Sequence, residues 1–148
     1  MKVLFLAQHK WPHVGGVERH IKEVSLSLRK KGHTITIISE ESIKYPKIKF
    51  IGLLHIWLWL WRNRKLIKET NVVHCHDVFI WYLPFRFLYP QKPVYTTFHG
   101  WEGVWPIPWK NITLKRLAAR LSWGTIAVGG YIEKYYGIKA DKIIYGAI

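Results

Sequence analysis

The chain of 148 residues has little cysteine, and its longest apolar run is too short to span a membrane. Its one cysteine, Cys75, cannot form an internal disulfide, so nothing in the sequence indicates an oxidising compartment. The longest near-continuous apolar stretch, 50–61, includes His55, and a helix that crosses a bilayer needs about 20 apolar residues. The apolar run at 3–7 is too short for the core of a signal peptide. We therefore expect a cytoplasmic protein, either free or bound peripherally at the inner face of the plasma membrane.

Acidic residues are also scarce. The sequence has nine Asp and Glu residues but 23 Lys and Arg residues, which gives a net charge of +14. Such an excess indicates an anionic partner, and nucleic acid, a membrane surface and a phosphorylated substrate all qualify. A hydrophobic fraction of 49% excludes disorder. The length is that of one domain and is too short for two nucleotide-binding lobes.

The two common glycine signatures of nucleotide binding are missing. The sequence contains no Gly-x-Gly-x-x-Gly and no Gly-Lys dipeptide of a P-loop. What it does contain is Gly15-Gly16 directly before a helical pattern, eight residues beyond the first apolar run. Free N–H groups at a helix N-terminus bind phosphate, and glycine lets a ligand approach the backbone. The pair therefore predicts a phosphate cradle, although a turn that needs positive φ would look the same.

Short apolar runs alternate with helical patterns along the whole chain. Strands are predicted at 3–7, 34–39, 72–75, 94–98, 124–128 and 143–145, with a further candidate at 48–53. Helices are predicted at 17–31, 56–70, 79–89 and 112–122, with a short one before the last strand. This alternation predicts one α/β domain over 1–148, a Rossmann-like, doubly wound and mainly parallel sheet. Ligands of such folds bind at the carboxyl ends of the strands.

An ordered series of motifs resembles one enzyme family. The segments are Pro12-x-x-Gly15-Gly16-Val17-Glu18-Arg19-His20, then 72–77 (VVHCHD), 96–100 (TTFHG), 125–128 (TIAV) and 142–148 (KIIYGAI). Together they resemble the N-terminal lobe of family-4-type retaining glycosyltransferases of the GT-B superfamily, over essentially the whole chain. The resemblance implies an enzyme that moves a sugar from a nucleotide-diphosphate sugar to an acceptor, either a lipid-linked molecule or a polysaccharide. It implies no cofactor beyond that donor.

The resemblance also implies residue roles. Gly15 and Gly16 would lie against the donor diphosphate, and His99 would be the catalytic residue beside the transferred sugar. His76 and Asp77 would line the acceptor side of the cleft as substrate-binding residues.

The sequence departs from the family in two ways. Gly129 stands where the family usually has serine, and no two glutamates lie eight apart, so the donor-binding Glu-x7-Glu of the C-terminal lobe is absent. We therefore expect an acceptor-side lobe that needs a C-terminal donor-binding lobe, in cis or as a separate subunit in trans, and that is inactive alone. The alternative is a stand-alone nucleotide- or NAD-binding α/β protein.

The histidines invite a metal interpretation. His74 and His76 would point the same way from an extended strand and could bind zinc with Asp77 and His99. A structural zinc site needs four closed ligands, however, and the longer His-x-His-x-Asp-His pattern of zinc hydrolases is missing. We expect no metal. Cys75 would point to the other face of the strand and act as a small apolar residue rather than as a nucleophile.

Two surfaces combine tryptophan with cations. On a continuous helix over 56–68, Ile56, Leu60 and Ile67 would face the sheet. An outward arc would carry Trp57, Trp61, Arg64, Lys65 and Lys68, and a proline-containing loop would add Trp101, Trp105 and Trp109. Tryptophan beside Lys and Arg predicts an anionic membrane surface that bears the acceptor; ordinary solvated helices with tryptophans in the core are the alternative.

The helix at 112–122 is interpreted as a normal solvated helix. Its inward residues would be Leu114, Leu117, Ala118 and Leu121, and its outward ones Lys115, Arg116 and Arg120. Because the basic residues are spread over several helices and no nucleic-acid signature is present, we expect no nucleic-acid partner.

Overall fold

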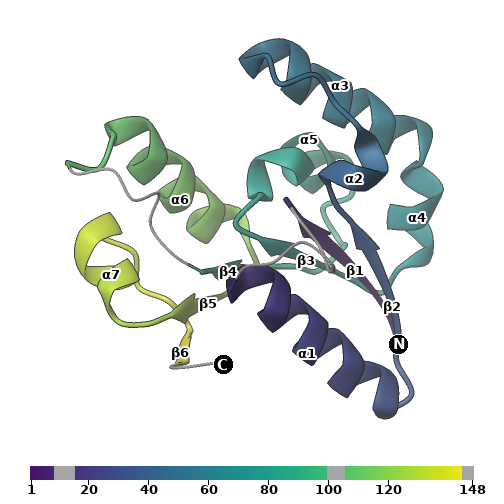
Figure 1. Ribbon diagram of the computed structural model, residues 1–148, viewed down its shortest axis with the longest axis horizontal. Coiled ribbons are helices and arrows are strands. Elements are labelled where there is room, and N and C mark those ends of the chain that lie inside the picture. Colours follow the sequence, from purple (N-terminus) through teal and green to yellow (C-terminus); the bar gives the residue numbers. More distant parts are fainter. Residues whose placement is uncertain (9–15, 100–105, 145–148) are drawn as a thin grey trace.

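The computed structural model describes residues 1–8, 16–99 and 106–144, and within them six strands form one sheet (Figure 1). The strands are β1 (Lys2–Ala7), β2 (Thr34–Ile38), β3 (Val72–His76), β4 (Val94–Phe98), β5 (Gly124–Val128) and β6 (Lys142–Ile144). Their order is β2-β1-β3-β4-β5-β6, and every neighbouring pair is parallel. The predicted α/β, Rossmann-like class is confirmed.

Helices cover both faces of this sheet. They are α1 (Gly16–Lys30), α2 (Glu40–Ile43), α3 (Lys49–Arg62), α4 (Arg64–Glu69), α5 (Phe79–Leu88), α6 (Trp109–Leu121) and α7 (Tyr131–Tyr136). In Figure 1, α1 lies below the sheet, and α3, α4, α5 and α6 lie above it. The core accordingly has two parts, a small one around Phe5, Ile21 and Ile35 on the α1 side and a larger one on the other.

The strands form where apolar runs bury both faces of the sheet. All five residues from Val3 to Ala7 are at most 9% exposed, as a central strand of a parallel sheet requires. In β3 the side chains alternate: Cys75 belongs to the larger core and is fully buried, whereas His74 and His76 face α1. The prediction that Cys75 points away from both histidines is confirmed.

The predicted strand at 48–53 is wrong, because this segment begins α3. The backbone N–H of Gly52 donates to the Ile48 carbonyl, a helical bond. Gly52, Ile56 and Leu60 follow one another at intervals of four and are all buried, so the apolar run has the helical period. A continuous apolar run cannot by itself distinguish the two periods.

The predicted helix over 56–70 is interrupted. Asn63 ends α3 by donating both its backbone N–H and its side-chain amide to the Trp59 carbonyl, and α4 begins at the next residue. The predicted inward residues Ile56, Leu60 and Ile67 are confirmed as buried. Within the described ranges, no helix combines the length and the apolar character needed to cross a membrane.

Candidate functional site

The carboxyl ends of the central strands bring two of the predicted site residues together. Ala7 of β1 pairs with His76 of β3, His76 pairs with Thr97 of β4, and His99 follows directly after β4. His76 Nδ1 and His99 Nε2 lie 2.9 Å apart in a hydrogen bond. The His20 ring, from the second turn of α1, lies 4.8 Å from the His99 ring, centroid to centroid. His99 therefore sits between the strand ends and the start of α1.

A stack of imidazoles lies beneath His99. The rings of His74 and His76 are 4.4 Å apart and nearly parallel, and His74 Nε2 forms a hydrogen bond of 2.6 Å with Thr97 Oγ1. Phe5 of β1 packs edge-on against His76 with ring centroids 4.8 Å apart. His76 Nε2 is buried with no hydrogen-bond partner in the described residues. His74 is thus a buried histidine that is hydrogen-bonded to a neighbouring strand.

Burial keeps these histidines uncharged. It lowers the pKa of His74 to about 4 and that of His99 to about 3, with the neighbouring His20 as a further cause for both. It also lowers the pKa of His20, and that of His76 well below its usual value. A neutral imidazole can donate one hydrogen bond and accept another. His99 therefore carries no charge at neutral pH and can act as a hydrogen-bond donor or acceptor.

Asp77 follows β3 in a left-handed conformation, with φ 63°. Its Oδ2 accepts the His99 backbone N–H at 2.9 Å, and its Oδ1 accepts from Lys115 Nζ at 3.1 Å. Tyr131 Oη donates to the His99 carbonyl at 3.0 Å. Both carboxylate oxygens are therefore engaged with the protein, and His99 is held at its backbone N–H, its carbonyl and its ring.

The prediction for α6 is wrong at two positions. Lys115, expected outward, is 8% exposed and faces Asp77, whereas Leu114, expected inward, is 44% exposed. The helix therefore buries a different face from the predicted one, because the Lys115 ammonium group pairs with the Asp77 carboxylate. Sequence reasoning missed Lys115, Tyr131 and His20 as site residues, and only His20 carried a signal, as part of the glycine-loop motif.

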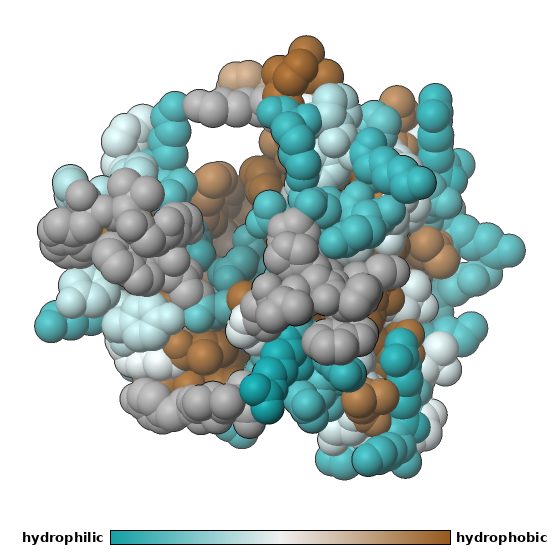
Figure 2. Space-filling model, in the orientation of Figure 1, coloured by the Kyte–Doolittle hydropathy of each residue, from teal (hydrophilic) through white to brown (hydrophobic). Residues whose placement is uncertain are grey.

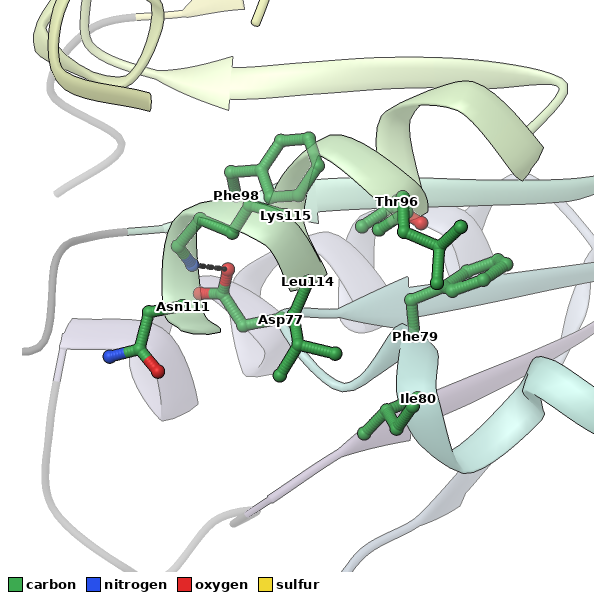
Figure 3. A pocket seen from close by; sticks show the side chains of 10 residues that line it. Asp77, Phe79, Ile80, Thr96, Phe98, Asn111, Leu114 and Lys115 are labelled. Atoms are coloured by element: carbon green, nitrogen blue, oxygen red, sulfur yellow. Dashed lines mark hydrogen bonds and ion pairs between the residues drawn. The ribbon is translucent and has the colours of Figure 1, made fainter. Parts of the chain in front are cut away.

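Between α5 and α6 the structure holds a pocket of about 90 Å³ (Figure 3). Its walls are mainly apolar, from Phe79, Ile80 and Leu114, and the Lys115–Asp77 pair closes one side. Figure 3 shows this pair as a dashed line at the edge of the cavity. Within the pair the Lys115 side chain is 9% exposed and that of Asp77 is 26% exposed, so the ammonium group is the more buried partner.

The predicted phosphate cradle is described only in part. Gly16 is the first residue of α1, and within the described ranges nothing lies within 4 Å of a Cβ added there. Gly15 lies outside the described residues, as do Trp101 and Trp105. Trp109 is the first residue of α6 and is 71% exposed.

The departure at Gly129 has a structural reason. Gly129 has φ 103°, a conformation that side-chain-bearing residues rarely adopt, and an added Cβ would lie 2.7 Å from the Tyr131 ring. Tyr131 thus fills the space of a side chain at 129 and uses its hydroxyl to hold His99.

The residues weighed above as possible zinc ligands are His74, His76, Asp77 and His99. In the parts of the chain that the structure describes, no group of three or more His, Cys, Asp or Glu side chains is arranged to hold a metal ion. Three of the histidine nitrogens form hydrogen bonds: His74 Nε2 with Thr97, and His76 Nδ1 with His99 Nε2.

The predicted tryptophan and cation arc differs in the structure. Trp57 faces α5, where its Nε1 donates to the Ile80 carbonyl at 2.9 Å. The guanidinium of Arg64 stacks on Trp61 at 4.4 Å from the ring centroid. Lys65 pairs with Glu69 at 3.6 Å across an exposed turn, and Lys68 is exposed. The break at Asn63 separates residues that one continuous helix would have aligned.

Instead, α3 turns apolar side chains outward. The exposed residues are Phe50 (80%), Ile51 (54%), Leu54 (60%), Leu58 (48%) and Trp61 (44%). Figure 2 shows hydrophobic residues at the upper edge of the molecule, where Figure 1 places the outer end of α3.

Comparison with known proteins agrees with the fold and the motifs. The sequence profile of Glycosyltransferase Family 4 matches residues 14–145. No curated protein matches the sequence significantly.

Among solved structures, the chain is similar to an α-glucosyltransferase (AGT) in complex with UDP, with TM-score 0.55, 11% identity and coverage of 98% of this chain and 43% of that one. It is also similar to an α-glucosyltransferase in complex with UDP-glucose and DNA containing an abasic site, with TM-score 0.54, 11% identity and coverage of 98% and 42%. The chain thus spans less than half the length of these structures, and at this identity the likeness shows the fold alone. Because the family profile matches most of its length, this chain belongs to Glycosyltransferase Family 4, and its fold agrees with that membership.

Proposed function

We propose that the chain is the acceptor-side lobe of a retaining GT-B glycosyltransferase. The whole enzyme moves a sugar from a nucleotide-diphosphate sugar to an acceptor, with no cofactor besides the donor and no protein-bound metal. A second, donor-binding lobe completes the site, in cis or in trans. Family membership and the absence of Gly-x-Gly-x-x-Gly speak against a stand-alone NAD-binding protein.

One observation carries the proposal: the position of His99 beside the start of α1. The His20 contact places the His99 ring next to the first turns of α1, which begins at Gly16. Backbone N–H groups there would stabilise the diphosphate as its charge grows during departure. The neutral His99 ring would hydrogen-bond the transferred sugar. His76 holds that ring, and the acceptor would enter past it.

The test is release of nucleoside diphosphate from a panel of UDP-, GDP- and ADP-sugars. The similar folds were solved with UDP or UDP-glucose, so UDP-sugars are the first probes. We expect no turnover by the 148 residues alone and turnover when the second lobe is present, unaffected by EDTA. In that complete enzyme, His99→Ala should lower the rate about 100-fold, as loss of one oriented hydrogen-bond donor does. His33→Ala, beyond the amino end of β2, is the matched control.

Turnover by the isolated chain would contradict the need for a second lobe. Full activity of the His99→Ala enzyme would contradict the site. Product with inverted anomeric configuration, seen by NMR, would contradict retention.

We also propose that the acceptor is reached at an anionic membrane surface, through the outward apolar face of α3. Five large apolar side chains of α3 are exposed, and α3 contains no acidic residue. Exposed basic residues flank this face: Lys44 and Lys47 before it, and Arg62, Lys65 and Lys68 after it. An apolar helix face bordered by cations suits a bilayer of anionic lipids, where each cation adds about 1 kcal/mol.

Co-sedimentation with phosphatidylglycerol-containing and pure phosphatidylcholine vesicles tests this attachment. We expect binding to the anionic vesicles at low salt, and loss of that binding in Leu54→Asp. Leu26→Asp alters a similarly exposed leucine on α1, on the other side of the sheet, and should still bind. Equal sedimentation of wild type and Leu54→Asp would contradict the membrane role. Binding of the outward apolar face of α3 to the second lobe would also contradict it.

A further inference from the structure

We infer that Asp77 and Lys115 are positioning residues for His99 and do not themselves contact the acceptor. This inference rests on the proposed function for its catalytic meaning, but its structural part stands alone. The motif resemblance had given Asp77 to the acceptor. In the structure both of its carboxylate oxygens are engaged by the protein: Oδ2 accepts the His99 backbone N–H and Oδ1 accepts from Lys115 Nζ.

The backbone conformation of Asp77 contributes to the positioning of His99. Asp77 has φ 63°, a left-handed conformation uncommon for residues with side chains and tolerated best by Asn and Asp. Its own N–H donates to the Thr97 carbonyl at 3.1 Å, which fixes the turn after β3 to the end of β4. From that turn the short side chain reaches the His99 N–H two residues beyond Thr97. A local bridge thus ties the ends of β3 and β4 together, directly at His99.

Lys115 fixes the carboxylate of this bridge. Its side chain is 9% exposed, and its Nζ lies 5.6 Å from the Phe98 ring centroid and 5.1 Å from the Tyr136 ring centroid. Two aromatic rings and a carboxylate therefore lie beside the ammonium group, and cation–π contact adds to the ion pair. A buried lysine whose partner carboxylate is removed or turned away is strongly unfavourable. The pair accordingly restricts Asp77 to the orientation in which Oδ2 accepts from His99.

The consequence concerns rate rather than affinity. If His99 must lie precisely against the reacting sugar, loosening its backbone lowers the fraction of bound complexes that can react. Binding of donor and acceptor, which have other contacts, changes little. A residue that touched the acceptor would instead alter the acceptor KM.

Hydrogen exchange of the 148-residue chain tests the structural part. In Lys115→Met the His99 amide should exchange at least about tenfold faster than in wild type, because its acceptor is no longer held. The Asp77 amide, bonded to the Thr97 carbonyl, should change less. Lys115→Arg should restore protection, and Lys110→Met, an exposed lysine on the same helix, should leave it unchanged. Unchanged protection at His99, or equal acceleration at every sheet amide, would overturn the inference.

Should Lys115→Met not fold, Asp77→Asn gives the same information. The amide oxygen can still accept from His99, but the charge that pairs with Lys115 is lost, so His99 protection should fall while β1 stays protected. Protection at His99 equal to wild type would overturn the inference.

Steady-state kinetics of the complete, two-lobe enzyme test the catalytic part. For Lys115→Met we expect kcat to fall about 10- to 100-fold, with both KM values within about twofold. A rise in acceptor KM with kcat unchanged would show that the pair contacts the acceptor, and the inference would be wrong. If the wild-type enzyme transfers no sugar, the proposed function fails, while the exchange result still decides whether the pair positions His99.

Discussion

The buried histidines make folding stability depend on pH in a defined window. An unfolded histidine has pKa about 6.5, whereas burial lowers the pKa of His74 to about 4 and that of His99 to about 3. Between these values the unfolded chain binds protons that the folded chain does not, so the free energy of unfolding falls as pH falls. Above pH 6.5 both states are neutral and the effect vanishes.

The size of the effect follows from the pKa of His74. With about 4 in the folded state and about 6.5 in the unfolded state, this histidine costs about 2 kcal/mol at pH 5, relative to pH 7.5. Its contribution to the slope is up to about 1.4 kcal/mol per pH unit. His99 adds a similar amount, and the lowered pKa values of His20 and His76 act in the same direction.

The assay is urea unfolding at pH 7.5, 6.5, 5.5 and 5.0. His74→Gln should be less stable at pH 7.5 because the Thr97 hydrogen bond is altered, but its stability should fall less steeply below pH 6.5. The slope of the unfolding free energy against pH should decrease by the contribution of one proton, which is about 1.4 kcal/mol per pH unit. Leu26→Ala, an exposed and non-titrating position on α1 outside the cluster, should keep the wild-type slope. Equal slopes for wild type and His74→Gln would refute the idea that burial holds this histidine neutral.

Three further outcomes can be checked on the same chain. Burial raises the pKa of the Cys75 thiol, which is fully buried, so DTNB should label it only when urea unfolds the protein; fast labelling of the native chain would contradict its place in the core. Trp57→Phe loses the hydrogen bond to the Ile80 carbonyl and should cost about 1 kcal/mol in urea unfolding, whereas no loss would mean that the indole does not dock on α5. Gly52→Ala should destabilise despite a helix-propensity gain of about 1 kcal/mol, because the new Cβ would lie 2.5 Å from the Pro46 carbonyl oxygen; a higher melting temperature would contradict that packing.

The sheet and most helices were predictable because each depends on local pattern. The runs at 3–7 and 94–98 have the length and composition of buried strands, and the structure confirms them. The strand predicted at 48–53 is wrong because such a short, mainly apolar run shows neither the helical nor the strand period. The outward position predicted for Trp57 is wrong because its indole N–H bonds to the Ile80 carbonyl of α5, a tertiary contact that helical periodicity does not show. The predicted arc through Arg64, Lys65 and Lys68 is wrong for another reason, because α3 ends at Asn63.

The site was predictable only in part. Motif resemblance singled out His76, Asp77 and His99, and the parallel sheet does bring them together at its carboxyl edge. The inward turn of Lys115 depends on a carboxylate 38 residues earlier in the chain, and helical periodicity carries no information on such a pair. Local pattern therefore indicates that a helix is present at 112–122, but long-range pairing determines which face it buries.

The central claim is that this lobe meets a nucleotide-diphosphate sugar at the start of α1 beside His99. The most direct measurement is an NMR titration of the ¹⁵N-labelled chain with UDP-glucose, NAD and a DNA duplex in turn. We predict weak binding of UDP-glucose, with shift changes concentrated at the amides of Gly16 and His99, and no specific changes with NAD or DNA. Tight binding of NAD, or UDP-glucose shifts confined to residues away from α1 and His99, would contradict the account.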